Sequence, residues 1–219
     1  MNKILIAISQ RSESNKYGVR IDVLESDYIT YLEKFGVILL PLPNSTDDLG
    51  YYFDHFPVQG IILSGGEDIS PESYGERGEG ISPRDLTEKK MLDLAVMRKL
   101  PVLGICRGLQ FINVYFKGRL VKDIKEELGE HLPAKDHSIK TAEGEFLVNS
   151  YHNQGVSEEK LSTELKTWAT CGKLVEALYH PSLPIAGIQW HPERNSPDKE
   201  LNKRIIAAFI NRRWFWENY

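Results

Sequence analysis

Short apolar runs of strand length recur through the first half of the chain, separated by longer stretches with helical spacing. The apolar runs cover residues 3–8, 37–40, 60–63 and 101–105. Apolar residues at helical spacing predict helices over residues 21–35, 86–100 and 108–116. Strands that alternate with helices favour βαβ units. The pattern therefore predicts an α/β fold with a mostly parallel sheet and helices on both faces.

Strand-like runs dominate the second half. They cover residues 145–149, 166–170, 174–179 and 185–190, and we expect them to form a small antiparallel extension of the sheet. A closing helix is predicted over residues 198–212, and the aromatic residues 214–216 after it are expected to pack back on the domain or on a partner chain. No repeat is present and no linker separates two compositions, so residues 1–219 are predicted to form one domain.

Composition changes this picture little but argues against several classes of function. The net charge of −4 and the pI near 5.9 give no field that would attract nucleic acid. The N-terminal apolar run is of strand length, whereas a membrane span needs about twenty apolar residues and a signal peptide also needs a longer run. The two cysteines, Cys106 and Cys171, lie far apart and indicate no disulfide framework. We therefore expect a cytoplasmic protein that binds neither nucleic acid nor membrane.

A candidate nucleophile lies where the run at residues 101–105 meets the next helical pattern. Gly104 and Gly108 flank Cys106 there, which is the layout of a nucleophile elbow with cysteine in place of serine. A helix N-terminus favours the thiolate over the thiol, and the N–H of Arg107 is placed to stabilise an oxyanion. The alternative is a buried structural cysteine. The paired glycines and the sharp change of period favour the nucleophile.

A second glycine element follows the strand predicted at residues 60–63. Gly65 and Gly66 expose main-chain N–H groups that a ligand can approach closely, so they are candidates for the other half of an oxyanion hole. The alternative is a simple turn. The element is neither a dinucleotide-binding nor a P-loop signature, because the third glycine and the Gly-Lys-Ser/Thr sequence are missing.

A candidate base and its orienting group end the run at residues 185–190. His191 and Glu193 are two positions apart, and such residues project to the same side of an extended chain. Glu193 can then accept a hydrogen bond from one imidazole nitrogen while the other nitrogen faces Cys106. The alternatives are a surface ion pair and a zinc deaminase site. The latter requires a Pro-Cys-x-x-Cys sequence that the chain lacks, so we predict no metal site.

Taken together, these motifs resemble the class I glutamine amidotransferase superfamily, and more closely its γ-glutamyl-γ-aminobutyrate hydrolase branch. The resemblance covers nearly the whole chain. Its motifs are residues 64–75 (SGGEDISPESYG), 104–114 (GICRGLQFINV), 148–156 (VNSYHNQGV) and 189–193 (QWHPE).

The resemblance implies an α/β fold with a flavodoxin-like central sheet and a site that needs no cofactor. It implies a catalytic triad, an oxyanion hole formed by the main chain of two residues, and contacts to the glutamyl end of a substrate. The triad is Cys106, His191 and Glu193, and the oxyanion hole is formed by Gly66 and Arg107. The contacts to the glutamyl end come from Gly65, Gln110, Ser150, Tyr151 and His152. The resemblance is also compatible with a homodimer.

The activity implied is hydrolysis of a small-molecule γ-glutamyl amide to glutamate and an amine through a glutamyl thioester. A hydrolase of a γ-glutamyl nucleotide of the CDP-amidate type, in surface-polysaccharide synthesis, is one alternative, and Arg107 or Arg194 would then be available to a phosphate. The others are a glutaminase subunit that delivers ammonia to a separate synthetase and a catalytically inactive binding protein. Two features depart from the family pattern: the connection over residues 74–86 is shorter, and Lys117 replaces a frequent glycine. Loops around the mouth of the pocket select the leaving amine, so the sequence does not identify that amine.

Overall fold

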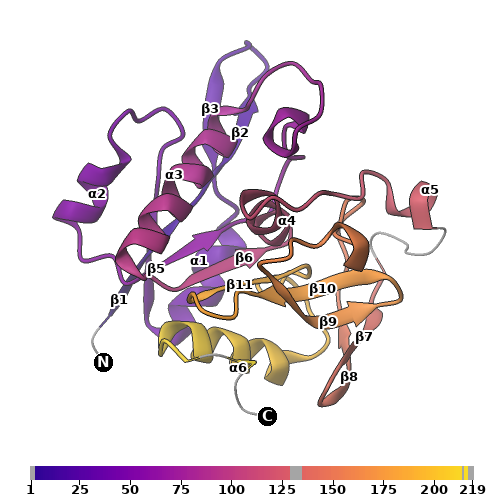
Figure 1. The fold of residues 1–219 in the computed structure, drawn as a ribbon. Coiled ribbons are helices and arrows are strands. Elements are labelled where there is room, and N and C mark those ends of the chain that lie inside the picture. The colour runs from indigo at the N-terminus through magenta and orange to yellow at the C-terminus, as the bar shows by residue number, and fades with distance from the viewer. Residues whose placement is uncertain (1–2, 129–134, 214, 217–219) are drawn as a thin grey trace.

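A computed structural model of the chain describes residues 3–128, 135–213 and 215–216. Its centre is a nine-stranded sheet with the order β4-β1-β5-β6-β11-β10-β9-β7-β8 (Figure 1). The first five strands in this order are parallel to one another. Their bounds are Val37–Pro41 for β4, Ile4–Ile8 for β1, Gly60–Leu63 for β5, Val102–Ile105 for β6 and Ile185–Ile188 for β11. The predicted mostly parallel sheet is thus confirmed.

The antiparallel extension is also present, with one correction to its membership. It consists of β10 (Leu174–Tyr179), β9 (Lys166–Cys171), β7 (His137–Thr141) and β8 (Gly144–Val148). The sequence pattern places the run at residues 185–190 in this extension, but β11 pairs parallel with β6 and belongs to the main sheet. Its apolar residues are buried on both faces, as is typical of a central parallel strand.

Helices cover both faces of the sheet and divide its side chains between two cores. On one face lie α2 (Leu49–His55), α3 (Pro83–Arg98) and α4 (Arg107–Tyr115), and on the other lie α1 (Ser26–Leu32) and α6 (Lys199–Ile210). Within β5, Ile61 and Leu63 enter the first core while Ile62 enters the second. This alternation follows from the two-residue period of a strand. It explains why the central strands are continuously apolar.

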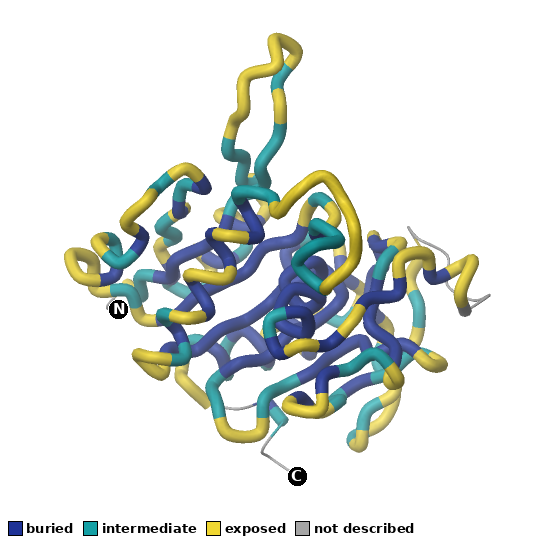
Figure 2. Tube along the Cα trace, turned by 45° about the horizontal axis from the view of Figure 1, so that its top comes forward, coloured by how far each residue is buried: buried dark blue, intermediate teal, exposed yellow. Residues whose placement is uncertain are grey.

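The structure differs from the predicted helix at residues 21–35. The first residues of that segment instead form β3 (Arg20–Val23), which pairs with β2 (Arg11–Ser14) in a hairpin whose exposed tip projects from the domain (Figure 2). Helix α1 begins only at Ser26, and a 3₁₀ turn (Glu33–Phe35) continues it. Ile21 and Val23 lie two positions apart, but a four-residue strand carries too few positions to reveal a period of two.

Three further elements were absent from the prediction. Helix α2 and α5 (Ile124–Leu128) are too short to show a periodic pattern, and β7 is a polar strand near the edge of the sheet. Conversely, α3 begins before the predicted start, because Ser82 caps it by accepting a hydrogen bond from the N–H of Asp85 (3.1 Å).

The aromatic end of the chain packs back on the sheet. Phe215 is buried against Trp168 of β9, with ring centroids 5.0 Å apart, and Trp216 stacks on Tyr179 of β10. Trp214 lies outside the described residues. Among the helices that the structure describes, none is long and apolar enough to cross a membrane.

Candidate active site

Cys106 occupies the sharp turn between β6 and α4. Its φ of 54° and ψ of −103° lie outside the regions that L-residues favour, as expected of a strained elbow. A Cβ on Gly104 would lie 2.5 Å from the main chain of Gly108, and a Cβ on Gly108 would overlap the carbonyl oxygen of Leu63. Both glycines are therefore required by close packing around the turn, for the reason that the sequence pattern suggested.

The sheet topology brings His191 to the same place. Strand β11 lies beside β6, with Ile188 paired to Ile105, and the N–H of Cys106 donates to the carbonyl oxygen of Ile188 (2.8 Å). His191 follows three residues later and is 2 % exposed. Parallel neighbouring strands end at the same edge of a sheet, so the two functional segments emerge together although they are far apart in sequence.

His191 and Glu193 form the expected pair. The Nδ1 atom of His191 lies 2.6 Å from Oε1 of Glu193, and both side chains are buried. Asn149 fixes the main chain of His191, since its Oδ1 accepts from the His191 N–H and its Nδ2 donates to the His191 carbonyl oxygen, each at 2.9 Å. The main chain of His191 is therefore held at both its N–H and its carbonyl, and the ring is held at Nδ1, which leaves Nε2 for another partner.

The pKa of the His191 imidazole depends on the neighbouring sulfur of Cys106. Burial by itself lowers the pKa of His191, but the negative charge and hydrogen bond of Cys106, followed by the hydrogen bond and charge of Glu193, outweigh it and raise the pKa to about 10. The imidazole keeps its proton well above neutral pH, because the two groups beside it stabilise its positive charge.

The loop after β5 lies against the imidazole. A Cβ on Gly65 would approach Cε1 of His191 to 2.6 Å, so only glycine fits at this position. The N–H of Gly65 donates to the hydroxyl of Tyr28 (2.9 Å) and is therefore engaged within the protein. Gly66 has a φ of 142°, which also favours glycine. Among the described residues, neither the N–H of Gly66 nor that of Arg107 has an acceptor.

The side chain of Arg107 does not face a substrate. Its guanidinium is buried and contacts the carboxylates of Asp85 and Glu88. The expectation that Arg107 could meet a substrate phosphate is therefore wrong, because both ends of its guanidinium are held by buried acids. Arg194 is different: it stacks over the ring of Tyr151 at 4.6 Å and pairs with Glu25 at 2.9 Å, and it stays partly exposed.

The residues expected at the glutamyl end differ in what they contact. Gln110 is buried and donates to the carbonyl oxygen of Gln154 (2.9 Å). Tyr151 sets its ring edge-to-face on His191, with centroids 5.7 Å apart. Ser150 and His152 are buried on either side of Tyr151, and Nδ1 of His152 lies 2.9 Å from the carbonyl oxygen of Gln154.

Several residues at the site were not singled out from the sequence. Gln189 donates from Nε2 to the sulfur of Cys106 at 3.5 Å, and its place within the QWHPE motif was the signal that could have identified it. Asn149 likewise lies within the motif at residues 148–156, whereas Tyr28 gave no local signal, since its partner Gly65 is thirty-seven positions away. Among the described residues, no cluster of three or more histidine, cysteine or acidic side chains is arranged to hold a metal ion.

Two curated relatives show what this chain is similar to. The γ-glutamyl-γ-aminobutyrate hydrolase of Escherichia coli strain K12 is 30% identical over 223 residues, which cover 88% of this chain and 87% of the relative. The γ-glutamyl-CDP-amidate hydrolase of Campylobacter jejuni is 33% identical over 157 residues, which cover 71% of this chain and 72% of the relative.

Solved structures and a family model agree with these relatives. A glutamine amidotransferase from Thermotoga maritima superposes with a TM-score of 0.60 at 15% identity, covering 95% of this chain and 83% of that one. A candidate GMP synthase component from Thermoplasma acidophilum gives a TM-score of 0.68 at 20% identity, covering 97% and 96%. These likenesses show the fold.

The model of the Peptidase C26 family matches residues 4–193. With the curated relatives, this match shows that the chain belongs to Peptidase C26 and is a glutamine amidotransferase-like hydrolase.

Proposed function

We propose that this protein cleaves the γ-glutamyl amide bond of a small-molecule conjugate and releases glutamate and an amine, with Cys106 as the nucleophile. The observation that carries the proposal is the strained cysteine at the start of α4, hydrogen-bonded to an imidazole that Glu193 holds at 2.6 Å. The relatives named as γ-glutamyl hydrolases support this substrate class.

In the first half of the reaction, the Cys106 thiolate attacks the δ-carbonyl carbon and an S–C bond forms. The N–H groups of Gly66 and Arg107 stabilise the oxyanion. As the C–N bond breaks, the imidazolium of His191 gives its proton to the departing nitrogen. The amine leaves, and a glutamyl thioester and a neutral imidazole remain.

In the second half, His191 takes a proton from water while the water oxygen bonds to the thioester carbon. The C–S bond breaks, glutamate leaves, and the thiolate and imidazolium are restored. Glu193 orients the imidazole throughout and stabilises its positive charge. Gln110, Ser150, Tyr151 and His152 are proposed to border the glutamyl end. Tyr151 packs on the imidazole, Ser150 and His152 are its buried neighbours in sequence, and the N–H of Gln110 donates to the carbonyl oxygen of Cys106.

A nucleotide-linked substrate is the second candidate. The observation that favours it is the partly exposed guanidinium of Arg194 beside the site, together with the 33% identical relative that acts on a γ-glutamyl CDP-amidate. An arginine suits a phosphate because its planar donors match the phosphate oxygens.

Release of glutamate from a panel of γ-glutamyl compounds tests both candidates. The panel contains γ-glutamyl-γ-aminobutyrate, a γ-glutamyl nucleotide amidate, γ-glutamyl p-nitroanilide and glutamine. Brisk turnover of a conjugate by the purified chain supports the hydrolase, and preference for the nucleotide favours the second candidate. Silence on every compound, relieved only by a synthetase partner, would instead identify a dependent glutaminase and refute the proposal.

The raised pKa of His191 predicts the alkaline side of the pH profile. The imidazolium must be protonated to release the amine. Its pKa lies above the ordinary value of 6.5, so the proton stays bound through neutral pH. We therefore expect kcat/KM to hold between about pH 7 and 9 and to decline as the pH rises through about 10. A profile of kcat/KM against pH checks this, and a decline already complete at pH 8 would contradict it.

A further inference from the structure

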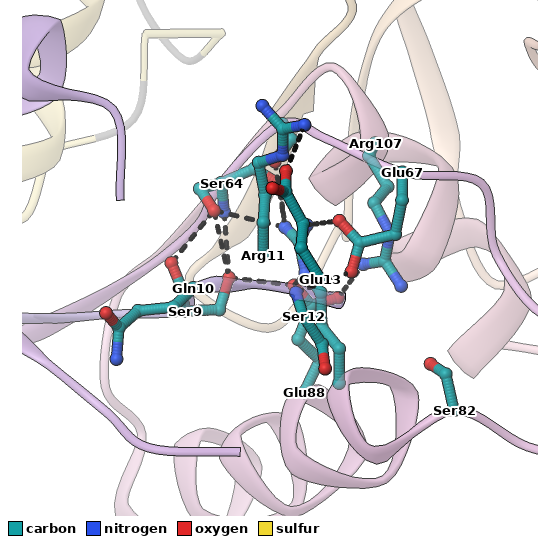
Figure 3. Close-up of polar contacts among 12 residues, drawn as sticks. Ser9, Gln10, Arg11, Ser12, Glu13, Ser64, Glu67, Ser82, Glu88 and Arg107 are labelled. Atoms are coloured by element: carbon teal, nitrogen blue, oxygen red, sulfur yellow. Dashed lines mark hydrogen bonds and ion pairs between the residues drawn. The ribbon is translucent and has the colours of Figure 1, made fainter. Parts of the chain in front are cut away.

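Helix α3 carries three charged side chains into the interior, and the mechanism above gives none of them a task. Arg84, Asp85 and Glu88 are each at most 1 % exposed. Figure 3 shows Glu88 in its polar surroundings, which include Ser9, Ser64 and Arg107. A charge taken out of water costs several kcal/mol in effective terms unless it is paired and hydrogen-bonded. Their placement therefore calls for a reason beyond the packing of a helix on a sheet.

Arg84 donates several hydrogen bonds to the loop that follows β5. Its Nη2 donates to the carbonyl oxygen of Ser64 (2.6 Å), to the Ser64 hydroxyl (3.0 Å) and to the carbonyl oxygen of Gly65 (3.0 Å). Its Nε donates to Glu88 (2.9 Å) and its Nη1 to Glu67 (2.6 Å). A Cβ on Gly66 would lie 2.5 Å from Nη1, so the guanidinium packs directly against this loop.

The other polar groups of the same loop are held too. The N–H of Ser64 donates to the hydroxyl of Ser9 (3.0 Å), and the N–H of Gly65 donates to the hydroxyl of Tyr28 (2.9 Å). Every main-chain donor and acceptor from the Ser64 N–H to the Gly65 carbonyl therefore has a side-chain partner. The next donor, the N–H of Gly66, has no acceptor among the described residues.

A peptide unit is planar and trans, so its carbonyl and its N–H point in opposite directions. Where Arg84 fixes the carbonyl oxygen of Gly65, it also fixes the direction of the Gly66 N–H, away from the guanidinium. Gly65 itself lies against the ring of His191. We propose that Arg84, braced by Glu88 and Ser9, is a positioning residue that orients the Gly66 peptide for oxyanion stabilisation. This inference rests on the proposed function.

The same bracing residues reach the second proposed donor. Glu88 accepts from Ser9 (2.7 Å) and pairs with the guanidinium of Arg107, which Asp85 also contacts. Burial raises the pKa of Glu88, but the charges of Arg107 and Arg84 outweigh it and lower that pKa, so Glu88 is ionised at neutral pH. The segments that carry the Gly66 and Arg107 N–H groups are thus tied to one helix.

The variant Arg84→Lys tests this role, because a lysine keeps the charge beside Glu88 but cannot span both loop carbonyls. Arg98→Lys is the matched control on the same helix, since Arg98 lies near the surface and contacts Asp54 and the carbonyl oxygen and ring of Phe53, away from the loop after β5. Four quantities are compared: kcat and KM on the best γ-glutamyl substrate, inhibition by L-glutamate γ-semialdehyde, the rate of Cys106 alkylation by iodoacetamide, and the Tm.

We expect Arg84→Lys to lower kcat by about 10²- to 10³-fold with KM changed less than about threefold, the loss typical of one oxyanion donor. The aldehyde forms a tetrahedral adduct with the sulfur, so its affinity should weaken in parallel. Iodoacetamide needs no oxyanion hole, and its rate should stay within about threefold of the parent. Arg98→Lys should match the parent in all four measurements.

Equal kcat in Arg84→Lys and Arg98→Lys would overturn the inference, as would loss of alkylation in step with kcat in a folded variant. If Arg84→Lys does not fold, Ser9→Ala decides the matter, because it deletes an uncharged anchor of the same loop. Selective weakening of aldehyde binding in Ser9→Ala supports the inference, and unchanged binding refutes it. Failure of the proposed function is distinct from these outcomes, since the parent protein would then hydrolyse no γ-glutamyl compound.

Discussion

Replacing Cys106 with alanine is expected to lower γ-glutamyl hydrolysis by at least about 10⁴-fold, because removal of a catalytic nucleophile leaves only the contribution of binding and the oxyanion hole. The fold should persist. Cysteine and alanine bear the same penalty at the positive φ of residue 106, and the side chain fills little volume. Glutamate release measured under substrate saturation, with the Tm alongside, checks both parts of this expectation.

Cys171→Ser is the matched control for this experiment. Cys171 lies at the end of β9, away from the elbow, so its replacement should change the rate less than about threefold. Mass spectrometry of the protein during turnover should detect a glutamyl adduct in the parent and in Cys171→Ser, and none in Cys106→Ala. Hydrolysis by Cys106→Ala near the parent rate would remove the basis of the proposed mechanism.

Replacing Glu193 with glutamine is expected to lower kcat by about 10²- to 10⁴-fold while KM changes little. The amide keeps the shape of the side chain but removes the charge that stabilises the imidazolium, and it can favour the wrong tautomer of His191. Without the carboxylate the pKa of His191 falls, so the alkaline decline of kcat/KM should move to lower pH. Kinetics across the pH range measure both effects.

Glu200→Gln serves as the control for the loss of a carboxylate. Glu200 is exposed on α6 and, within the part of the chain that the structure describes, pairs with Lys203 alone, so its replacement should leave the rate and the pH profile unchanged. A Glu193→Gln variant whose profile coincides with that of Glu200→Gln would show that Glu193 does not act on the imidazole.

The central strands and the local motifs could be predicted because each is encoded in contiguous residues. A continuous apolar run identifies a strand buried on both faces, and β5 and β10 have the predicted bounds. The nucleophile elbow and the His-x-Glu pair each span only a few residues, so the spacing within each motif reveals it. The hairpin of β2 and β3 carries mostly polar residues, and its register arises only from pairing, which a periodic pattern does not show.

The buried charges of α3 were not predicted for a related reason. Charged residues on a helix with apolar residues between them indicate a solvated face. Arg84 and Glu88 lie instead against Ser9, Ser64 and Arg107, residues supplied by segments nineteen to seventy-nine positions away. Whether a charge is buried depends on such tertiary partners, and a single sequence does not reveal which of them meet.

The order of the strands in the sheet determines where a peptide can be inserted into this protein without disturbing the candidate site. Strands β6 and β11 are direct neighbours, although four strands of the chain lie between them in sequence. Those four run outward in the sheet to a free edge at β8. A peptide grafted into the β7–β8 turn would extend that outer rim while the pairing of β6 with β11 stays as it is. The rim is therefore a natural place for an affinity tag or a reporter loop in an active enzyme.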